Sequence, residues 1–203
     1  MLVSGGARGA DTIFQQCAES YGHMIKIING KNKKYTAAEI REYDSILLSI
    51  NHKYLNRVYP TNDTYVNTLL RRNIEISLEV EVIYAIGFLE YKDSKVSICG
   101  GTAWCCYSFI DKYYNFLSKT YVNFDRSIPL YFYNQKPCEY DNRVVIKSGW
   151  HIISLNNFDS NFKIESNYIG EDIKLNKDNK IYAGIGSREI TQNGITAIKS
   201  LYT

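Results

Sequence analysis

Two glycine-rich turns lie at opposite ends of this 203-residue chain, and each follows a short apolar run. Residues 2–11 read LVSGGARGAD, and residues 180–188 read KIYAGIGSR. An apolar run that passes through glycines into a helix is typical of α/β proteins, whose helix N-termini present backbone N–H groups to a phosphate. A third such segment, VSICGGT, occupies residues 96–102. If the three strands are neighbours in one parallel sheet, their turns converge on one crevice, and the protein is then expected to bind a nucleotide ligand.

Apolar runs and helical periodicity alternate along most of the chain. They predict strands at residues 2–3, 24–28, 80–86, 96–99, 128–133 and 180–185, and helices at residues 11–21, 36–55, 65–78, 102–117 and 190–201. Thr36-Ala-Ala-Glu39 matches a capping box and marks the start of the second helix. The alternation predicts an α/β fold with a Rossmann-like, doubly wound and mostly parallel sheet.

The segment between the last two predicted strands has a different character. Residues 144–147 and 150–155 alternate around Ser148-Gly149, which predicts a hairpin, and residues 156–179 are polar and predict a linking loop. Residues 90–95 predict a charged turn. We expect residues 1–133 and 180–203 to form a single domain, and residues 134–179 to be a hairpin and linking loop inserted into it.

The order of the predicted elements suggests a circular permutation. Joining Thr203 to Met1 gives an uninterrupted right-handed β-α-β unit from the last strand, the last helix and the first strand. The alternative is that the last strand is swapped into a neighbouring subunit.

Composition and charge exclude several classes of protein. The net charge of +3 is too small to indicate nucleic-acid binding. The five cysteines have no zinc spacing and the three histidines lie far apart, so we expect reduced thiols and no metal. No signal peptide is recognisable, and no apolar run approaches the roughly 20 residues that cross a bilayer. The chain is expected to be cytoplasmic.

The turns at residues 4–11 and 183–188 resemble the two signature turns of the SLOG superfamily. This Rossmann-like group includes the LOG phosphoribohydrolases and the DNA-processing protein A fold. Within it, the chain is similar to circularly permuted phage and bacterial proteins whose Ala-Gly-Ile-Gly-Ser/Thr-Arg turn comes late. The resemblance covers about residues 1–133 and 180–203. Further matching segments are Gly100-Gly-Thr102, Arg71-Arg-Asn73, Tyr84-Ala-Ile-Gly87 and Ile128-Pro-Leu-Tyr131.

The resemblance implies a site for a nucleotide or nucleotide-sugar at the carboxyl edge of the sheet. The implied ligand is an adenosine, ADP-ribose or NAD derivative or a cyclic nucleotide that acts as a signal. The protein would sense or sequester this signal. In a virus, it would do so in the host cytoplasm and counter a host defence. The resemblance also implies a homo-oligomer. No cofactor is expected apart from this ligand. The length of the apolar runs predicts no membrane partner, and the small net charge predicts no nucleic-acid partner.

Catalysis is not expected from the resemblance. The phosphoribohydrolases carry a Pro-Gly-Gly-x-Gly-Thr-x-x-Glu motif, whereas residues 99–109 here read CGGTAWCCYSF. The first acid is Asp111, about nine residues into the helix and roughly 13 Å along it. We therefore expect a binder without catalytic residues. Two alternatives stay open: an N-glycosidase that uses Asp11 or Glu189 as its acid, and a structural module assembled by strand swapping.

The candidate ligand-binding residues come from the three turns and from the helix at residues 65–78. Glycines allow close backbone approach to a phosphate, arginines clamp it, Thr102 offers a hydroxyl, and Asp11 caps its helix or accepts a ribose hydroxyl. The full set is Ser4, Gly5, Gly6, Ala7, Arg8, Gly9, Asp11, Arg71, Asn73, Gly100, Gly101, Thr102, Gly184, Ile185, Gly186, Ser187 and Arg188.

Overall fold

The computed structural model describes residues 1–31, 33–118, 128–156, 163–176 and 178–203, and shows an α/β protein built on a nine-stranded sheet. The strand order is β2-β1-β11-β3-β6-β9-β10-β5-β4. The bounds are β1 Leu2–Ser4, β2 Ile25–Ile27, β3 Val82–Gly87, β4 Leu89–Lys92, β5 Lys95–Ile98, β6 Leu130–Asn134, β9 Gly149–Asn156, β10 Lys163–Gly170 and β11 Tyr182–Gly186. A separate two-stranded sheet pairs β7 (Cys138–Tyr140) with β8 (Arg143–Ile146).

The first and last strands of the chain lie side by side, as the two glycine turns predicted. β1 pairs in parallel with β11, with Leu2 opposite Tyr182 and Val3 opposite Ala183. β2, β1, β11, β3 and β6 are all parallel, and β3 is buried along its whole length. Continuous burial explains why β3 reads as an unbroken apolar run, since helices cover both faces of a parallel sheet.

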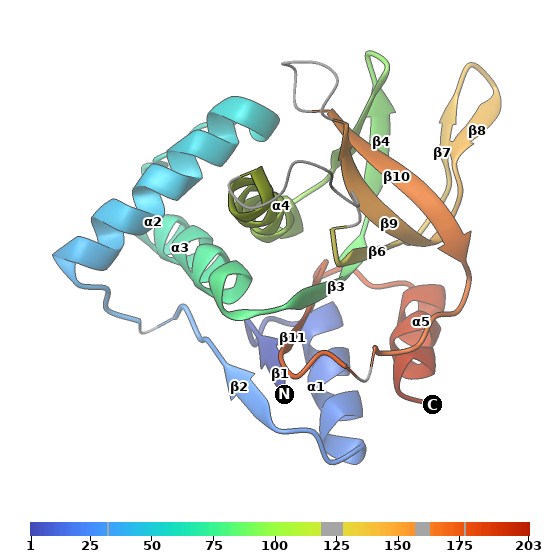
Figure 1. Ribbon diagram of the computed structural model, residues 1–203, viewed down its shortest axis with the longest axis horizontal. Helices are drawn as coiled ribbons and strands as arrows, with labels where there is room; N and C mark the ends of the chain where they lie inside the picture. Colours follow the sequence, from blue (N-terminus) through green and yellow to red (C-terminus); the bar gives the residue numbers. More distant parts are fainter. Residues whose placement is uncertain (32, 119–127, 157–162, 177) are drawn as a thin grey trace.

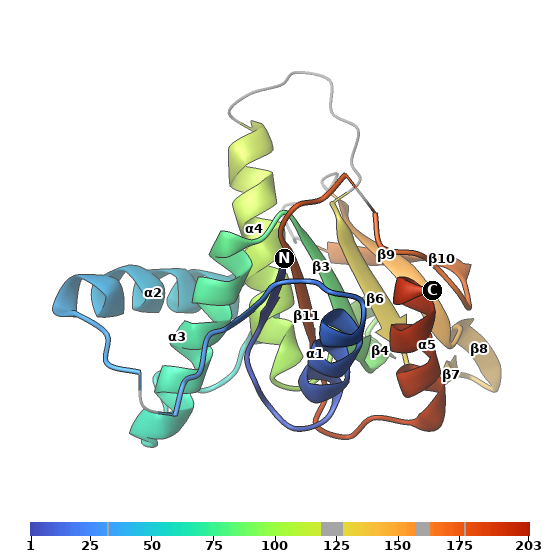
Figure 2. The ribbon, with the colours of Figure 1, turned by 90° about the horizontal axis from the view of Figure 1, so that it is seen from below.

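Helices cover both faces of this sheet (Figures 1 and 2). On one face α2 (Ala37–Ile50), α3 (Thr64–Glu79) and α4 (Thr102–Ser118) enclose the larger apolar core. On the other face α1 (Ala10–Ser20) and α5 (Gln192–Tyr202) enclose a second core. The predicted α/β class is therefore confirmed, with a Rossmann-like parallel half. The other half of the sheet, from β9 to β4, is antiparallel.

The predicted capping box at the start of α2 is formed. The Thr36 hydroxyl accepts a hydrogen bond from the Glu39 N–H, and the Glu39 carboxylate accepts one from the Thr36 N–H. α2 continues into a short π-helix, η1, at Asn51–Leu55, so the predicted end of the helix at residue 55 is confirmed although its last turn is not α-helical.

The strand before the third glycine turn, β5, is not adjacent to β1 and β11, so the condition that all three strands are neighbours is not met. β5 lies near the far edge of the sheet and is antiparallel to both β4 and β10. The predicted charged turn is a hairpin in which only Asp93 and Ser94 form the turn, both with positive φ. This turn shape pairs residues 89–92 with the strand at 95–98 and thereby reverses the chain within the same sheet.

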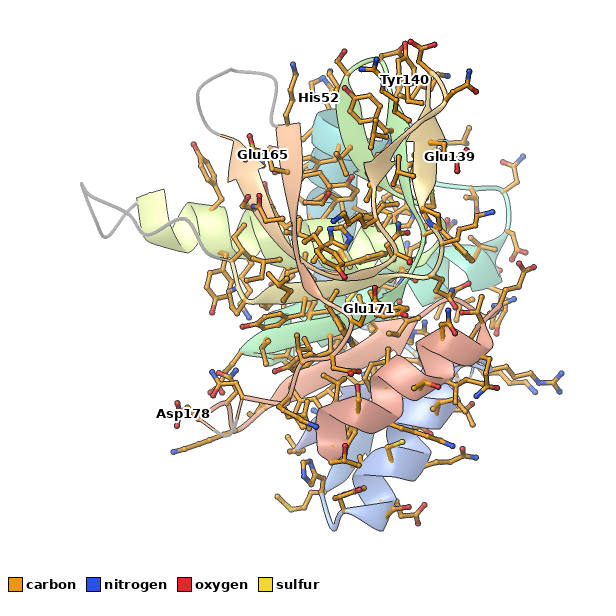
Figure 3. All side chains as sticks on the ribbon, turned by 90° about the vertical axis from the view of Figure 1, so that its right-hand side faces the viewer. His52, Glu139, Tyr140, Glu165, Glu171 and Asp178 are labelled. Carbon is orange, nitrogen blue, oxygen red and sulfur yellow. The ribbon has the colours of Figure 1, made fainter. Side chains whose placement is uncertain are left out.

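The prediction for residues 144–179 was also wrong in two places. β8 pairs with β7 through a turn at Asp141-Asn142, and not with β9. β10 is a strand that pairs with β9 where a linking loop was predicted; residues 157–162 and 177 lie outside the described residues. Half of the residues of β10 are exposed and only Ile164 is buried, so its sequence, KIESNYIG, lacks the apolar pattern of a buried strand. Figure 3 shows the projecting β7–β8 hairpin, which carries Glu139 and Tyr140.

Candidate functional site

A cavity of about 910 Å³ opens at the carboxyl ends of the neighbouring parallel strands β1, β11 and β3. This edge is where open α/β sheets bind ligands. Thirteen of the seventeen residues proposed from the sequence line it: Gly5, Gly6, Ala7, Arg8, Asp11, Asn73, Gly100, Gly101, Thr102, Ile185, Gly186, Ser187 and Arg188. The turn at Gly100–Thr102 lines the cavity although β5 is remote in the sheet, because the turn leads into α4, which packs against β3 and β6 as well as β5.

Three of the four proposed residues that do not line the cavity, Ser4, Gly9 and Gly184, contact or pack closely against the turns. The Ser4 hydroxyl accepts hydrogen bonds from the Gly6 N–H at 3.3 Å and from the Gln15 amide at 2.7 Å. Gly9 has a φ of 89°, and a Cβ there would lie 2.5 Å from the carbonyl oxygen of Arg188. A Cβ at Gly184 would overlap the ring of Phe14. These residues therefore allow close packing of the turns.

The fourth, Arg71, points away from the cavity and its neighbour Arg72 lines it instead. Arg71 makes a bidentate ion pair with Asp44 on α2, with N–O distances of 2.7 and 2.9 Å. Arg72 donates from Nη1 to the Gly5 carbonyl at 3.0 Å. Consecutive residues of a helix point about 100° apart, so only one of the two arginines can face the site. The spacing of Tyr65, Leu69, Arg72 and Ile76, all cavity-lining, follows one face of α3 and is a signal that sequence reasoning missed.

Asp11 joins the two glycine turns. Its carboxylate accepts hydrogen bonds from the Ala7 N–H at 3.2 Å and from the Gly186 N–H at 3.1 Å, and the residue is 3% exposed. Burial raises the pKa of Asp11 from its ordinary value of 3.8 to about 6, although these N–H groups and the charge of Arg72 act in the opposite direction. Two of the amides expected to bind phosphate are therefore already occupied by a carboxylate of the chain itself.

The pKa of Asp11 makes the stability of the fold depend on pH. Because this pKa is higher in the folded than in the unfolded chain, Asp11 contributes stability that is fully present below about pH 3.8 and is lost as the pH rises through about 6. A difference of about two units between the folded and unfolded pKa of Asp11 corresponds to about 3 kcal/mol in the free energy of unfolding. We expect Asp11→Asn to remove this dependence. Denaturant unfolding of both proteins between about pH 4 and 7 measures it, and a constant difference in free energy would contradict the assignment.

The N-terminus of α4 provides amide groups that no carboxylate occupies. Within the described residues, the N–H groups of Gly100, Gly101 and Thr102 have no acceptor. The carbonyl of Gly100 accepts from Arg57 at 2.7 Å and that of Gly101 from Asn73 at 3.3 Å, which fixes the turn. A Cβ at Gly101 would meet no atom within 4 Å. The positive end of the 17-residue helix α4 therefore faces open space in the cavity.

Cationic side chains surround the same space. Four basic residues line the cavity (Arg8, Lys31, Arg72 and Arg188), against two acids, Asp11 and Glu189. The side chains of Arg8, Lys31 and Arg188 have no partner within the described part of the chain. An excess of unpaired positive charge in a concave site favours an anionic ligand.

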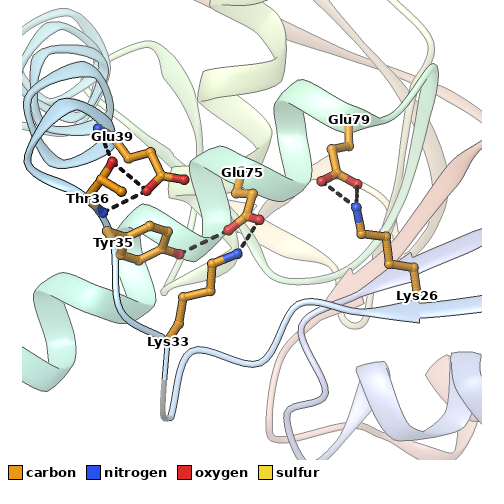
Figure 4. A network of polar contacts seen from close by, with 7 residues as sticks. All are labelled: Lys26, Lys33, Tyr35, Thr36, Glu39, Glu75 and Glu79. Carbon is orange, nitrogen blue, oxygen red and sulfur yellow. Dashed lines mark hydrogen bonds and ion pairs between the residues drawn. The ribbon is translucent and has the colours of Figure 1, made fainter.

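The β2–α2 connection forms one wall of the cavity and is tied to α3 by charged side chains (Figure 4). In the connection, Lys33 pairs with Glu75 at 2.6 Å and the Tyr35 hydroxyl donates to Glu75 at 3.1 Å. Lys26, on β2 itself, pairs with Glu79 at 2.6 Å. These contacts hold Asn29 and Lys31 against the cavity. Ion pairs between distant segments leave no periodic signal in the sequence, so this anchoring could not be predicted from it.

Gln135, at the end of β6, positions the loop that follows β11. Its side chain donates to the Glu189 carbonyl at 3.0 Å and accepts from the Thr191 N–H at 2.6 Å, while its own N–H donates to the Gly87 carbonyl at 2.9 Å. Gln135 is 4% exposed. It therefore fixes the backbone that carries Ser187 and Arg188, and no motif in the sequence indicated this.

The fold and the cavity define the class of protein: an α/β protein with a Rossmann-like parallel half and a cationic cleft at the carboxyl edge of its sheet. The described helices include none long and apolar enough to cross a membrane, and the described residues hold no group of three or more histidine, cysteine or acidic side chains suited to a metal. Comparisons with models of protein families, with curated proteins and with solved structures found no match.

Proposed function

We propose that this cleft binds a phosphorylated nucleoside or nucleotide-sugar through its anionic group. The observation that carries the proposal is the N-terminus of α4, where the unoccupied N–H groups of Gly100, Gly101 and Thr102 face a cavity with unpaired cationic side chains. Helix N-termini with exposed amides bind phosphate through hydrogen bonds and through the helix dipole. The Thr102 hydroxyl adds a further donor.

The apolar part of the cavity supports an aromatic group in the ligand. Tyr65, Val66 and Leu69 on α3 line it together with Phe88 after β3. The Tyr65 side chain is 47% exposed, so its ring is available for stacking on a base. A nucleotide combines a phosphate, which would bind at the N-terminus of α4, with a flat base, which would stack on Tyr65.

The finer parts of the proposal rest on the resemblance to the SLOG superfamily. From it we propose an adenosine, ADP-ribose, NAD-derived or cyclic nucleotide as the ligand, and sensing or sequestering of that signal as the use, including viral anti-defence. A homo-oligomer is proposed on the same ground. Mass spectrometry of what the purified protein releases on heating tests the ligand: an intact nucleotide supports binding, and a protein free of any nucleotide contradicts it.

Hydrolysis of an N-glycosidic bond is the second candidate, because the cavity contains two acids, Asp11 and Glu189. Glycosyl chemistry needs a carboxyl group near the anomeric centre. Incubation with a panel of nucleotides distinguishes the two functions: release of a free base indicates a hydrolase, whereas recovery of intact nucleotide indicates a binder.

Gly101→Asp is expected to weaken nucleotide binding at least about tenfold, because a carboxylate beside the α4 amides repels and displaces the phosphate. The variant should fold, since a side chain at this position meets no protein atom within 4 Å and an acid is favourable at a helix N-terminus. Gly101→Asn is the matched control, with the same shape and no charge. Isothermal calorimetry with the released nucleotide measures both. Equal affinity of the Asp and Asn variants would contradict an anion site at α4.

A further inference from the structure

The Asp11 carboxylate binds backbone amides of the glycine turns that we expected from the sequence to bind a phosphate. Its two carboxylate oxygens bind one amide from each glycine turn, Ala7 at 3.2 Å and Gly186 at 3.1 Å. The turns are also joined directly, because the Ala10 N–H donates to the Ser187 carbonyl at 3.1 Å. None of the ion pairs between described residues involves Asp11. The buried carboxylate is therefore held by backbone amides, as a bound anion would be.

We infer that Asp11 is a specificity-determining residue of this cleft: its carboxylate occupies the amides of both glycine turns, excludes the phosphate of a ligand from them, and accepts hydrogen bonds from uncharged donors such as hydroxyl groups. The inference rests on the proposed function, since it assigns the two ends of the proposed ligand. The phosphate lies at α4, and the hydroxyl-bearing part of the ligand faces Asp11.

The chemistry of a carboxylate carries this assignment. An ionised carboxylate has about four acceptor positions on its two oxygens, and two of them are used by Ala7 and Gly186. The remaining positions accept donors but repel a second anion. A phosphate that displaced Asp11 from the amides would leave a buried charge without partners, which is strongly unfavourable.

The charged and titratable groups around Asp11 come from every element at the cavity. They are Arg72 and Tyr65 on α3, Cys105 on α4, Cys99 after β5, Arg8 in the first turn, Arg188 and Glu189 after β11, and Lys31 on the β2–α2 connection. Burial raises the pKa of the Cys105 thiol to about 12, so it is neutral near pH 7. Asp11 is ionised at neutral pH and becomes protonated as the pH falls through about 6. Its exclusion of phosphate is therefore expected to weaken on acidification.

Two small probes separate the two ends of the site. Inorganic pyrophosphate carries a phosphate at each end, whereas ribose 5-phosphate carries one phosphate and several hydroxyl groups. We expect wild-type protein to prefer ribose 5-phosphate near pH 7.5. The Asp11→Asn variant is expected to bind pyrophosphate about tenfold more tightly than wild type, because the negative charge that repels a phosphate from the two glycine turns is removed. Binding of ribose 5-phosphate is expected to stay equal or to weaken.

The matched control is Glu189→Gln, which removes the same charge from the same cavity without touching the amides of the turns. We expect it to change the affinity for both probes in parallel and to preserve the ratio between them. The ratio of the pyrophosphate affinity of Asp11→Asn to that of wild type is expected to fall toward one near pH 5. An equal effect of the two variants, or an advantage that does not change with pH, would overturn the inference and leave the proposed function intact.

A measurement on the wild-type protein without ligand covers the case in which Asp11→Asn does not fold. The amide proton shifts of Ala7 and Gly186 should titrate together, with the midpoint of the Asp11 carboxyl group. Amides that do not respond to pH while Asp11 titrates would overturn the inference. Absence of binding of both probes by all proteins at every pH would overturn the proposed function, and this specificity role with it.

Discussion

Replacement of Gly186 by alanine is expected to lower the free energy of unfolding by about 3 kcal/mol, at the upper end of the cost of overpacking a core. An alanine Cβ would lie 2.5 Å from the carbonyl oxygen of Ile86 and 2.6 Å from the Cβ of Ala10. The first of these atoms belongs to the backbone of the adjacent strand β3, so no change of rotamer relieves the clash. Denaturant unfolding measures the loss, which corresponds to a decrease of about 6–12 °C in Tm for a chain of this size.

Gly101→Ala is the control for this prediction, because Gly101 lies in a glycine turn at the same cavity. A Cβ there meets no atom within 4 Å, and we expect the free energy of unfolding to stay within about 0.5 kcal/mol of wild type. The pair separates a glycine required by packing from one that leaves room in the cleft. Equal destabilisation by both substitutions would show that this distinction is wrong.

Lys112→Met is expected to destabilise the protein by about 3 kcal/mol, because hydrogen bonds to charged groups contribute more than neutral ones and Lys112 makes three of them. The ammonium group of Lys112 on α4 donates to the carbonyl oxygens of Ser77 at 3.2 Å, Leu78 at 2.8 Å and Val80 at 3.0 Å. These carbonyls end α3, where four acceptors of a helix lack partners within the helix. Methionine keeps most of the packing and removes all three bonds.

The control for Lys112 is Lys34→Met, since Lys34 is exposed and has no side-chain partner within the described residues. We expect Lys34→Met to leave the free energy of unfolding nearly unchanged. Hydrogen exchange locates the effect of Lys112→Met: the amides of the last turn of α3 should lose protection first. A loss below about 1 kcal/mol would mean that water replaces the ammonium group at these carbonyls.

The central strands of the parallel half, β1, β11 and β3, could be predicted from the sequence because they are buried on both faces. β3 and β11 read as apolar runs, and helix signals such as the capping box at Thr36 are local hydrogen bonds between neighbouring residues. The antiparallel half could not be predicted in the same way. The strand β10 is largely polar, and its place depends on pairing with β9, which no local pattern records.

In the candidate site, too, the features that depend on local sequence were predicted and those that depend on distant contacts were not. Glycines that follow apolar strands marked the two turns, and their side-by-side position is confirmed by the pairing of β1 with β11. The choice of Arg72 over Arg71, the support from Gln135 and the anchoring of the β2–α2 connection were not predicted. Each depends on contacts between residues that are far apart in the chain.

The sequence by itself determined the α/β class, the two neighbouring glycine turns and the start of α4, because glycine conformation, burial and helix capping act over a few residues. Only the tertiary structure decided how the amides of those turns are used. The Asp11 carboxylate is adjacent to its own turn in sequence, but the Gly186 amide reaches it only because β11 lies beside β1 in the folded chain. Hydrogen bonds between distant segments exist only once the sheet has formed, so the pattern of residues along the chain does not reveal them.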